Sequence, residues 1–154
     1  MLSFLKNAIM FNQPLIAALI ANTLAQIFKF ILGYIKNRRW DWVLLLRAGG
    51  MPSSHSALVA GVAHSLGLTQ GFGSPYFALA FVLAVAVIYD ATGIRRQAGK
   101  HAHIINKMIT ELASGHPLKQ EQLREVLGHT PLEALAGTIL GILVAQVVWW
   151  LSVG

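Results

Sequence analysis

The segment from Pro75 to Ile94 constrains this chain most, because it is apolar over most of its length. Within it, the thirteen residues from Phe77 to Tyr89 include no charged or strongly polar side chain. A helix needs about 20 mainly apolar residues to cross the hydrocarbon core of a bilayer, and this segment supplies them. The segment therefore predicts a transmembrane helix.

The composition agrees with a membrane protein. Of the 154 residues, 55% are hydrophobic and 12% are charged, and the mean hydropathy is +0.59. Soluble domains usually carry about a quarter charged residues. The length predicts a single domain, residues 1–154. The chain has no cysteine, which excludes disulfides and cysteine metal sites.

Three further segments, at about 14–34, 54–71 and 131–153, are also interpreted as membrane helices. The second is short and carries His55 and His64, so we expect neighbouring helices to shelter it. The first could instead be a signal peptide, but its apolar pattern continues to Tyr34, which favours a retained span. The predicted fold class is all-α: a polytopic membrane bundle of about four transmembrane helices (14–34, 54–71, 75–94 and 131–153) with one or two interfacial helices.

The positive charge is concentrated in two loops. Ten of the 12 Lys and Arg residues lie in 36–54 and 95–130, and the net charge is +6. Basic loops on one side of a set of spans follow the positive-inside rule, so loops 36–53 and 95–130 are predicted to face the cytoplasm. No nucleic-acid partner is expected, because the basic residues have no interleaved aromatic platform beyond Trp40 and Trp42.

The loop after the third span has a helical pattern of its own. Apolar residues recur at helical spacing at Ile104, Ile105, Met108, Ile109 and Leu112. This spacing predicts an amphipathic helix at the membrane interface. A break at 115–117 and a second short helix at 118–127 are expected to follow.

The first group of candidate functional residues opens the second span. Gly50 lets the backbone approach a ligand closely, and Ser53 or Ser54 can cap the helix, whose first N–H groups form an anion site. His55 could then donate a proton to a leaving oxygen. The competing interpretation is a helix cap with a histidine at the membrane interface, and local sequence leaves both open.

The second group opens the fourth span. His129 and Glu133 are four residues apart, so they lie side by side on a helix. A carboxylate bonded to one imidazole nitrogen fixes the tautomer and leaves the other as a nucleophile or base. Alternatively, His129, Thr130 and Pro131 simply start a helix whose positive end Glu133 stabilises.

Charged residues near the end of the third span form the third group. Arg95 and Arg96 could clamp phosphate oxygens, or could act only as topology determinants. Asp90 lies one turn inside an apolar span, where an ionisable group is costly unless it is paired. We therefore expect Asp90 to orient Arg95 or Arg96.

These motifs resemble those of a known superfamily. Pro52-Ser53-Ser54-His55 is similar to the Pro-Ser-Gly-His motif of the type 2 phosphatidic acid phosphatases, which are related to vanadium-dependent haloperoxidases. The stretch from Gly128 to Gly137 resembles their third motif, Arg-x5-His-x3-Asp. Nearly the whole chain, including 49–57 and 90–99, resembles the divergent branch of that superfamily.

The resemblance implies a mechanism and a set of site residues. His129 would attack phosphorus, Glu133 would hold its ring and His55 would protonate the departing alcohol. No metal or cofactor is implied, because basic residues neutralise the phosphate. The residues implied to bind phosphate are Arg95, Arg96, Lys36, Arg124, Ser53, Ser54 and Gly50.

The sequence departs from the family pattern at several positions. Glu133 replaces Asp, Ser54 replaces Gly, and Arg124 precedes His129 by four intervening residues instead of five. The first motif, Lys-x6-Arg-Pro, has no match before His55; the candidates for its role are Lys36, Arg39 and Arg47. An alternative third motif runs from Arg95 to His101 but has Ile105 in place of the carboxylate.

Three functions follow from these observations. The first is a membrane-embedded phosphatase that hydrolyses a lipid phosphate monoester or pyrophosphate through a phosphohistidine. The second is a non-catalytic protein that binds or moves an anionic lipid on the same scaffold. The third is a structural subunit, since Gly137 and Gly141 form a helix-packing pattern, and a homodimer is a further prediction.

Overall fold

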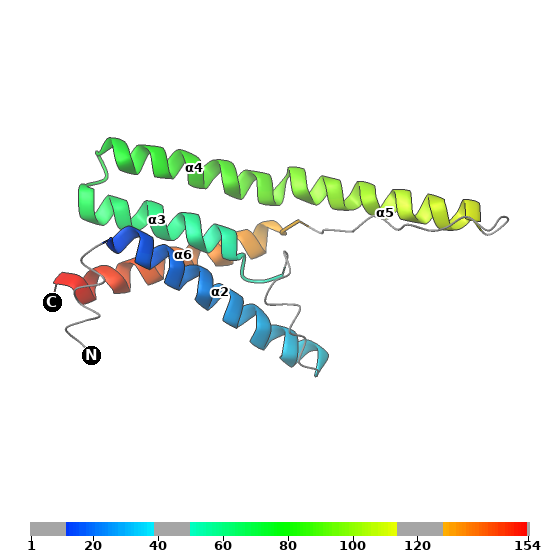
Figure 1. Cartoon of the computed structure of the whole chain (residues 1–154), viewed down its shortest axis with the longest axis horizontal. Helices are drawn as coiled ribbons and strands as arrows, with labels where there is room; N and C mark the ends of the chain where they lie inside the picture. The colour runs from blue at the N-terminus through cyan, green and yellow to red at the C-terminus, as the bar shows by residue number, and fades with distance from the viewer. Residues whose placement is uncertain (1–11, 39–49, 114–127, 154) are drawn as a thin grey trace.

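The computed structural model describes residues 12–38, 50–113 and 128–153. Within these ranges the chain is helical and contains no strand, as the fold-class prediction required. The helices are α2 (Gln13–Asn37), α3 (Ser54–Gln70), α4 (Pro75–Thr92), α5 (Ile94–Ala113) and α6 (Pro131–Val153). Helices α2, α3, α4 and α6 lie side by side and alternate in direction (Figure 1). The ends of α2 and α4 therefore lie at the same end of the bundle as the starts of α3 and α6.

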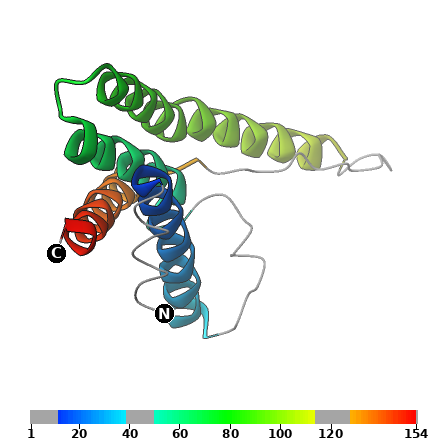
Figure 2. The same ribbon diagram turned by 60° about the vertical axis from the view of Figure 1, so that its left-hand side comes forward.

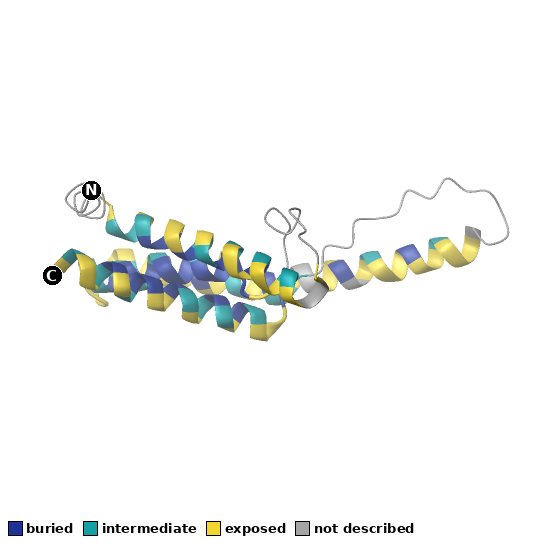
Figure 3. Cartoon of the chain, turned by 90° about the horizontal axis from the view of Figure 1, so that it is seen from below, coloured by how far each residue is buried: buried dark blue, intermediate teal, exposed yellow. Residues whose placement is uncertain are grey.

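Helix α3 is the centre of this bundle. It packs against α2, α4 and α6, and half of its length is buried (Figure 3). This confirms the expectation that neighbours shelter the shortest and most polar segment. Among the described residues, three stretches are long and apolar enough to cross a membrane, namely Gln13–Ile35, Pro75–Leu112 and Pro131–Val153. Since α3 is not one of them, the topology of four spans stays a prediction.

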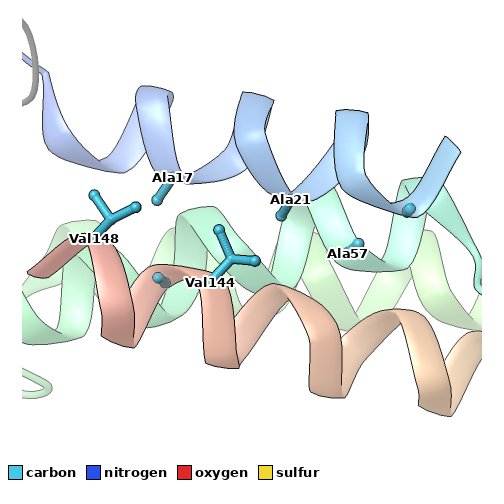
Figure 4. Packing of buried hydrophobic residues seen from close by; sticks show 7 residues of the cluster. Ala17, Ala21, Ala57, Val144 and Val148 are labelled. Atoms are coloured by element: carbon cyan, nitrogen blue, oxygen red, sulfur yellow. The ribbon is translucent and has the colours of Figure 1, made fainter. Parts of the chain in front are cut away.

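Small side chains form the core between α2, α3 and α6. The hydrophobic effect does not drive helices together in lipid, so close backbone approach and van der Waals packing must do so. Alanines dominate the contact, and two valines fill the remaining space (Figure 4). The core cluster comprises Ala17, Ala21, Ala25, Ala57, Val144, Ala145 and Val148.

Two glycines bring the backbone of α6 directly against α3. A Cβ atom at Gly137 would collide with the carbonyl oxygen of Ser53, and one at Gly141 would collide with that of Ala57. Only glycine fits such a contact. The Gly137-x3-Gly141 pattern therefore packs two helices of the same chain.

Helix α5 continues the direction of α4 beyond the bundle (Figures 1 and 2). Gly93 joins them, and its N–H still donates to the carbonyl oxygen of Tyr89 at 2.8 Å. Of the described helices, α5 contacts only α4. The amphipathic helix expected around 104–112 is therefore confirmed as a helix, whereas the predicted break at 115–117 and the short helix at 118–127 lie outside the described residues.

Candidate functional site

Two backbone hydrogen bonds hold the starts of α3 and α6 at the same end of the bundle. The N–H of His129 donates to the carbonyl oxygen of Ala91 in α4, at 3.0 Å. The N–H of Ser53 donates to the carbonyl oxygen of Glu133 in α6, at 2.9 Å. The end of α4 and the starts of α3 and α6 are thus joined.

The first turn of α6 is a capping box. The backbone N–H of Thr130 donates to Oε2 of Glu133 at 3.0 Å, and the backbone N–H of Glu133 donates to Oγ1 of Thr130 at 3.3 Å. Pro131 occupies the first helical position, where its missing N–H has no consequence. The structural interpretation of Thr130-Pro131 and Glu133 is therefore confirmed.

The same carboxylate also reaches His129. Nδ1 of His129 lies 3.3 Å from Oε2 of Glu133, and the histidine is only 5% exposed. An ionised carboxylate can only accept hydrogen bonds, so it favours the tautomer with the proton on Nδ1. In the neutral ring the lone pair then resides on Nε2. Capping of α6 and orientation of His129 are thus compatible functions of one side chain.

The start of α3 is built from buried serines. Ser53 is the N-cap, and its Oγ accepts from the N–H of Ser56 at 3.3 Å and lies 3.0 Å from the Ser56 hydroxyl. Ser53, Ser54 and Ser56 are all buried. The predicted cap is therefore present at Ser53, and Ser54 is the first residue of the helix.

His55 and Asp90 line a cavity of about 220 Å³, together with Ala86, Val87 and Ala91. His55 is exposed in the first turn of α3, and Asp90 is half-buried in the last turn of α4. His129 does not line this cavity. Its backbone N–H is hydrogen bonded to the carbonyl oxygen of Ala91, and Ala91 lines the cavity. The structure therefore places both histidines next to the end of α4.

Lys29 is a residue of this region that the sequence analysis missed. It lies in α2 and is only 4% exposed. Burial disfavours the charge of its ammonium group, and the nearby carboxylate of Glu133 partly offsets that effect. Its methylenes pack beside Gly50, where a Cβ atom would lie 3.4 Å from Cγ of Lys29. Gly50 has φ +85°, a conformation that favours glycine. A charge inside an apolar span is costly, so the sequence marks Lys29 as unusual, as it marks Asp90, but it does not determine whether the lysine is buried.

For three of the remaining predicted residues the structure describes only the backbone, and for three others it describes neither backbone nor side chain. Lys36 lies in the last turn of α2, and Arg95 and Arg96 lie in the first turn of α5; their side chains are outside the description. Arg39, Arg47 and Arg124 lie outside the described residues.

The alternative third motif lies apart from this cluster. His101 and Ile105 are exposed on α5, which among the described helices contacts only α4. His129 is instead buried and paired with a carboxylate. The described residues form no cluster of three or more His, Cys, Asp or Glu side chains that could hold a metal ion.

His64 has a partner that the sequence analysis did not identify. Its Nε2 lies 3.1 Å from Oε1 of Gln146, which joins α3 to α6. Its ring also lies near Phe72, with centroids 6.0 Å apart. The sequence does not indicate this pair, because Gln146 is distant from His64 in the chain and becomes its neighbour only through helix packing.

A bundle of apolar helices with a histidine–glutamate pair and a buried lysine at one end defines an integral membrane protein with a polar site at its helix termini. The chain belongs to the divergent PAP2 family, whose sequence model matches residues 10–144. It is also 40% identical over 147 residues to a Bacillus subtilis (strain 168) protein named "Uncharacterized membrane protein YuiD", with 88% of this chain and 93% of that protein covered. No solved structure matches the chain.

Proposed function

We propose that this protein is a membrane-embedded phosphatase that hydrolyses a lipid phosphate monoester or pyrophosphate. The observation that carries the proposal is the pairing of buried His129 with Glu133 at 3.3 Å, beside the start of α3 and the charge of Lys29. A carboxylate-oriented imidazole is a group suited to nucleophilic catalysis. Membership of the divergent PAP2 family supports phosphatase-related chemistry.

The reaction proceeds in two displacements. In the first, Nε2 of His129 attacks phosphorus, the bond from phosphorus to the ester oxygen breaks, and His55 gives a proton to the departing oxygen. In the second, water attacks the phosphohistidine, its proton passes to His55, and the nitrogen–phosphorus bond breaks to release phosphate. Glu133 stabilises the positive charge that develops on the His129 ring.

Positive charge at this end of the bundle would bind the phosphate oxygens. Among the residues that the structure describes, Lys29 is the candidate for this role. It would take the place of the basic residues of the first motif, which this sequence lacks. Arg95, Arg96, Lys36 and Arg124 are the candidates from sequence, with the backbone N–H groups that follow Ser53 and Ser54. Asp90, at the cavity with His55, orients one of these basic groups. The positive-inside rule places this end at the cytoplasmic face.

A second candidate function is binding or movement of an anionic lipid without catalysis. The capping box favours it, because the hydrogen bonds between Thr130 and Glu133 give both residues a structural role that needs no catalysis. Under this function the same cations hold a lipid phosphate that is never cleaved.

Phosphate release from a panel of lipid phosphates and pyrophosphates, measured with purified protein in nanodiscs, separates the two functions. The phosphatase releases phosphate in the presence of EDTA, is inhibited by vanadate, and forms an acid-labile, base-stable phosphoenzyme in a brief pulse with labelled substrate. His129→Gln and His55→Gln abolish release, while His101→Gln, on exposed α5, serves as the matched control. Lipid binding without release by the wild type would favour the second function.

A further inference from the structure

The apolar side of α5 is exposed along the whole helix. Ile94 is 64% exposed, Met108 is 55% exposed and Leu112 is 73% exposed, with Ile104 and Ile105 between them. These residues recur at the spacing of one helix face. A helix surrounded by water does not expose so many large apolar side chains on one side without a covering surface.

The charges of α5 indicate what covers this face. The helix contains Arg95, Arg96, Lys100 and Lys107, and Glu111 is its one acidic residue. Lys107 is highly exposed, and its contact with Glu111 is a loose pair at 3.9 Å on the same helix. A parallel second copy of α5 would bring like charges together, whereas an anionic lipid surface complements them.

The position of α5 brings it to such a surface. The candidate span Pro75–Leu112 includes both α4 and most of α5. Its lysines and arginines all lie in α5, after Gly93. We therefore expect the first residues of α5 to lie at the boundary between hydrocarbon and headgroups. Gly93 has φ −100° and ψ −86°, which departs from regular helical geometry and marks a point at which the two helices can bend.

We propose that α5 bends at Gly93 and lies along an anionic bilayer surface, with Ile94, Ile105, Met108 and Leu112 inserted among the lipids. Lys107 stays in water on the other side of the helix. This inference does not depend on phosphatase chemistry, so its test is separate from the test of function.

The experiment uses single labels, because the chain has no native cysteine. Met108→Cys and Leu112→Cys carry an environment-sensitive fluorophore, and Lys107→Cys on the opposite side is the matched control. Each full-length variant is reconstituted in nanodiscs of phosphatidylcholine with or without phosphatidylglycerol. Circular dichroism and gel filtration verify that every variant is folded.

In discs that contain phosphatidylglycerol, labels at 108 and 112 should shift their emission to the blue and be quenched by lipids that carry a nitroxide near the headgroup. The label at 107 should do neither. High salt should reduce the quenching, because at about 1 M ionic strength charges are screened within ~3 Å. Equal quenching at 107 and 112 would overturn the proposal, and so would self-crosslinking of Leu112→Cys in liposomes without lipid quenching, which would assign the face to a second copy.

Discussion

The carboxylate of Glu133 in α6 lies close enough to Lys29 of α2 to favour its charge, although more than 100 residues separate them in the chain. Lys29 is almost fully buried, and Glu133 is also engaged by Thr130 and His129. A buried charge whose partner is removed is strongly destabilising. Lys29 and Glu133 are therefore expected to contribute both to the stability of the bundle and to the geometry of the candidate site.

Lys29→Met and Glu133→Gln should each destabilise the protein, and the double variant should be less destabilised than the sum of the two. The coupling free energy expected for two residues of one charged network is about 0.5–3 kcal/mol. Unfolding by denaturant in detergent micelles measures it. Lys107→Met is the control, because its pair with Glu111 is exposed and exposed pairs contribute little. Strictly additive effects of the two substitutions would show that the charges do not interact.

Thr130→Ala and Glu133→Gln should separate capping from chemistry. Loss of the Thr130 cap should lower the free energy of unfolding by about 1 kcal/mol and leave turnover per folded molecule unchanged. Glu133→Gln retains a side-chain acceptor for the Thr130 N–H but removes the charge that stabilises a positive His129 ring. Its rate of phosphate release should fall by about 10²- to 10⁴-fold. A fall in rate for Thr130→Ala as large as for Glu133→Gln would contradict this division.

Gly137→Ala and Gly141→Ala should each destabilise the bundle by about 1–3 kcal/mol, because the added methyl group forces α6 away from the backbone of α3. Gly73→Ala is the matched control, since a Cβ atom there meets nothing within 4 Å. Thermal unfolding followed by circular dichroism measures the difference. If Gly73→Ala lowers the melting temperature as much as the other two, close packing is not the cause.

His64→Leu or Gln146→Leu should cost about 1–2 kcal/mol, because each leaves the other polar group without its hydrogen-bond partner in an apolar bundle. The double variant should recover part of that loss. The pair lies about 2.5 turns from His55 along α3, so phosphate release per folded molecule should not change. A selective loss of activity with unchanged stability would instead connect His64 with the site.

The elements near the site were largely predictable because their signals are local. The His129–Glu133 pair was expected from a spacing of four residues on one helix. The pair is present, but His129 precedes α6, so the carboxylate reaches back to it from the first turn. The Ser53 cap follows from a serine placed before an apolar run. The amphipathic pattern likewise predicted the helix around 104–112. Each of these inferences needed only a few neighbouring residues.

The parts that could not be predicted depend on packing between distant segments. Lys29 could as well have been a lysine that extends along the helix to the membrane surface, and its burial depends on how Gly50 and α6 lie against α2. The partner of His64 is 82 positions away in the chain. The Gly137-x3-Gly141 pattern does not reveal whether it faces the same chain or another copy. Only the three-dimensional arrangement distinguishes these cases.

The hydrogen bond from Ser53 to Glu133 and the close packing of Gly137 against Ser53 hold the first turns of α3 and α6 together as one unit. Bilayers of different thickness change the tilt of membrane helices, and we expect the joined first turns of α3 and α6 to move together when this happens. His55 and His129 should therefore keep their spacing when the surrounding lipid changes, while the opposite ends of the outer helices α2 and α4 adjust.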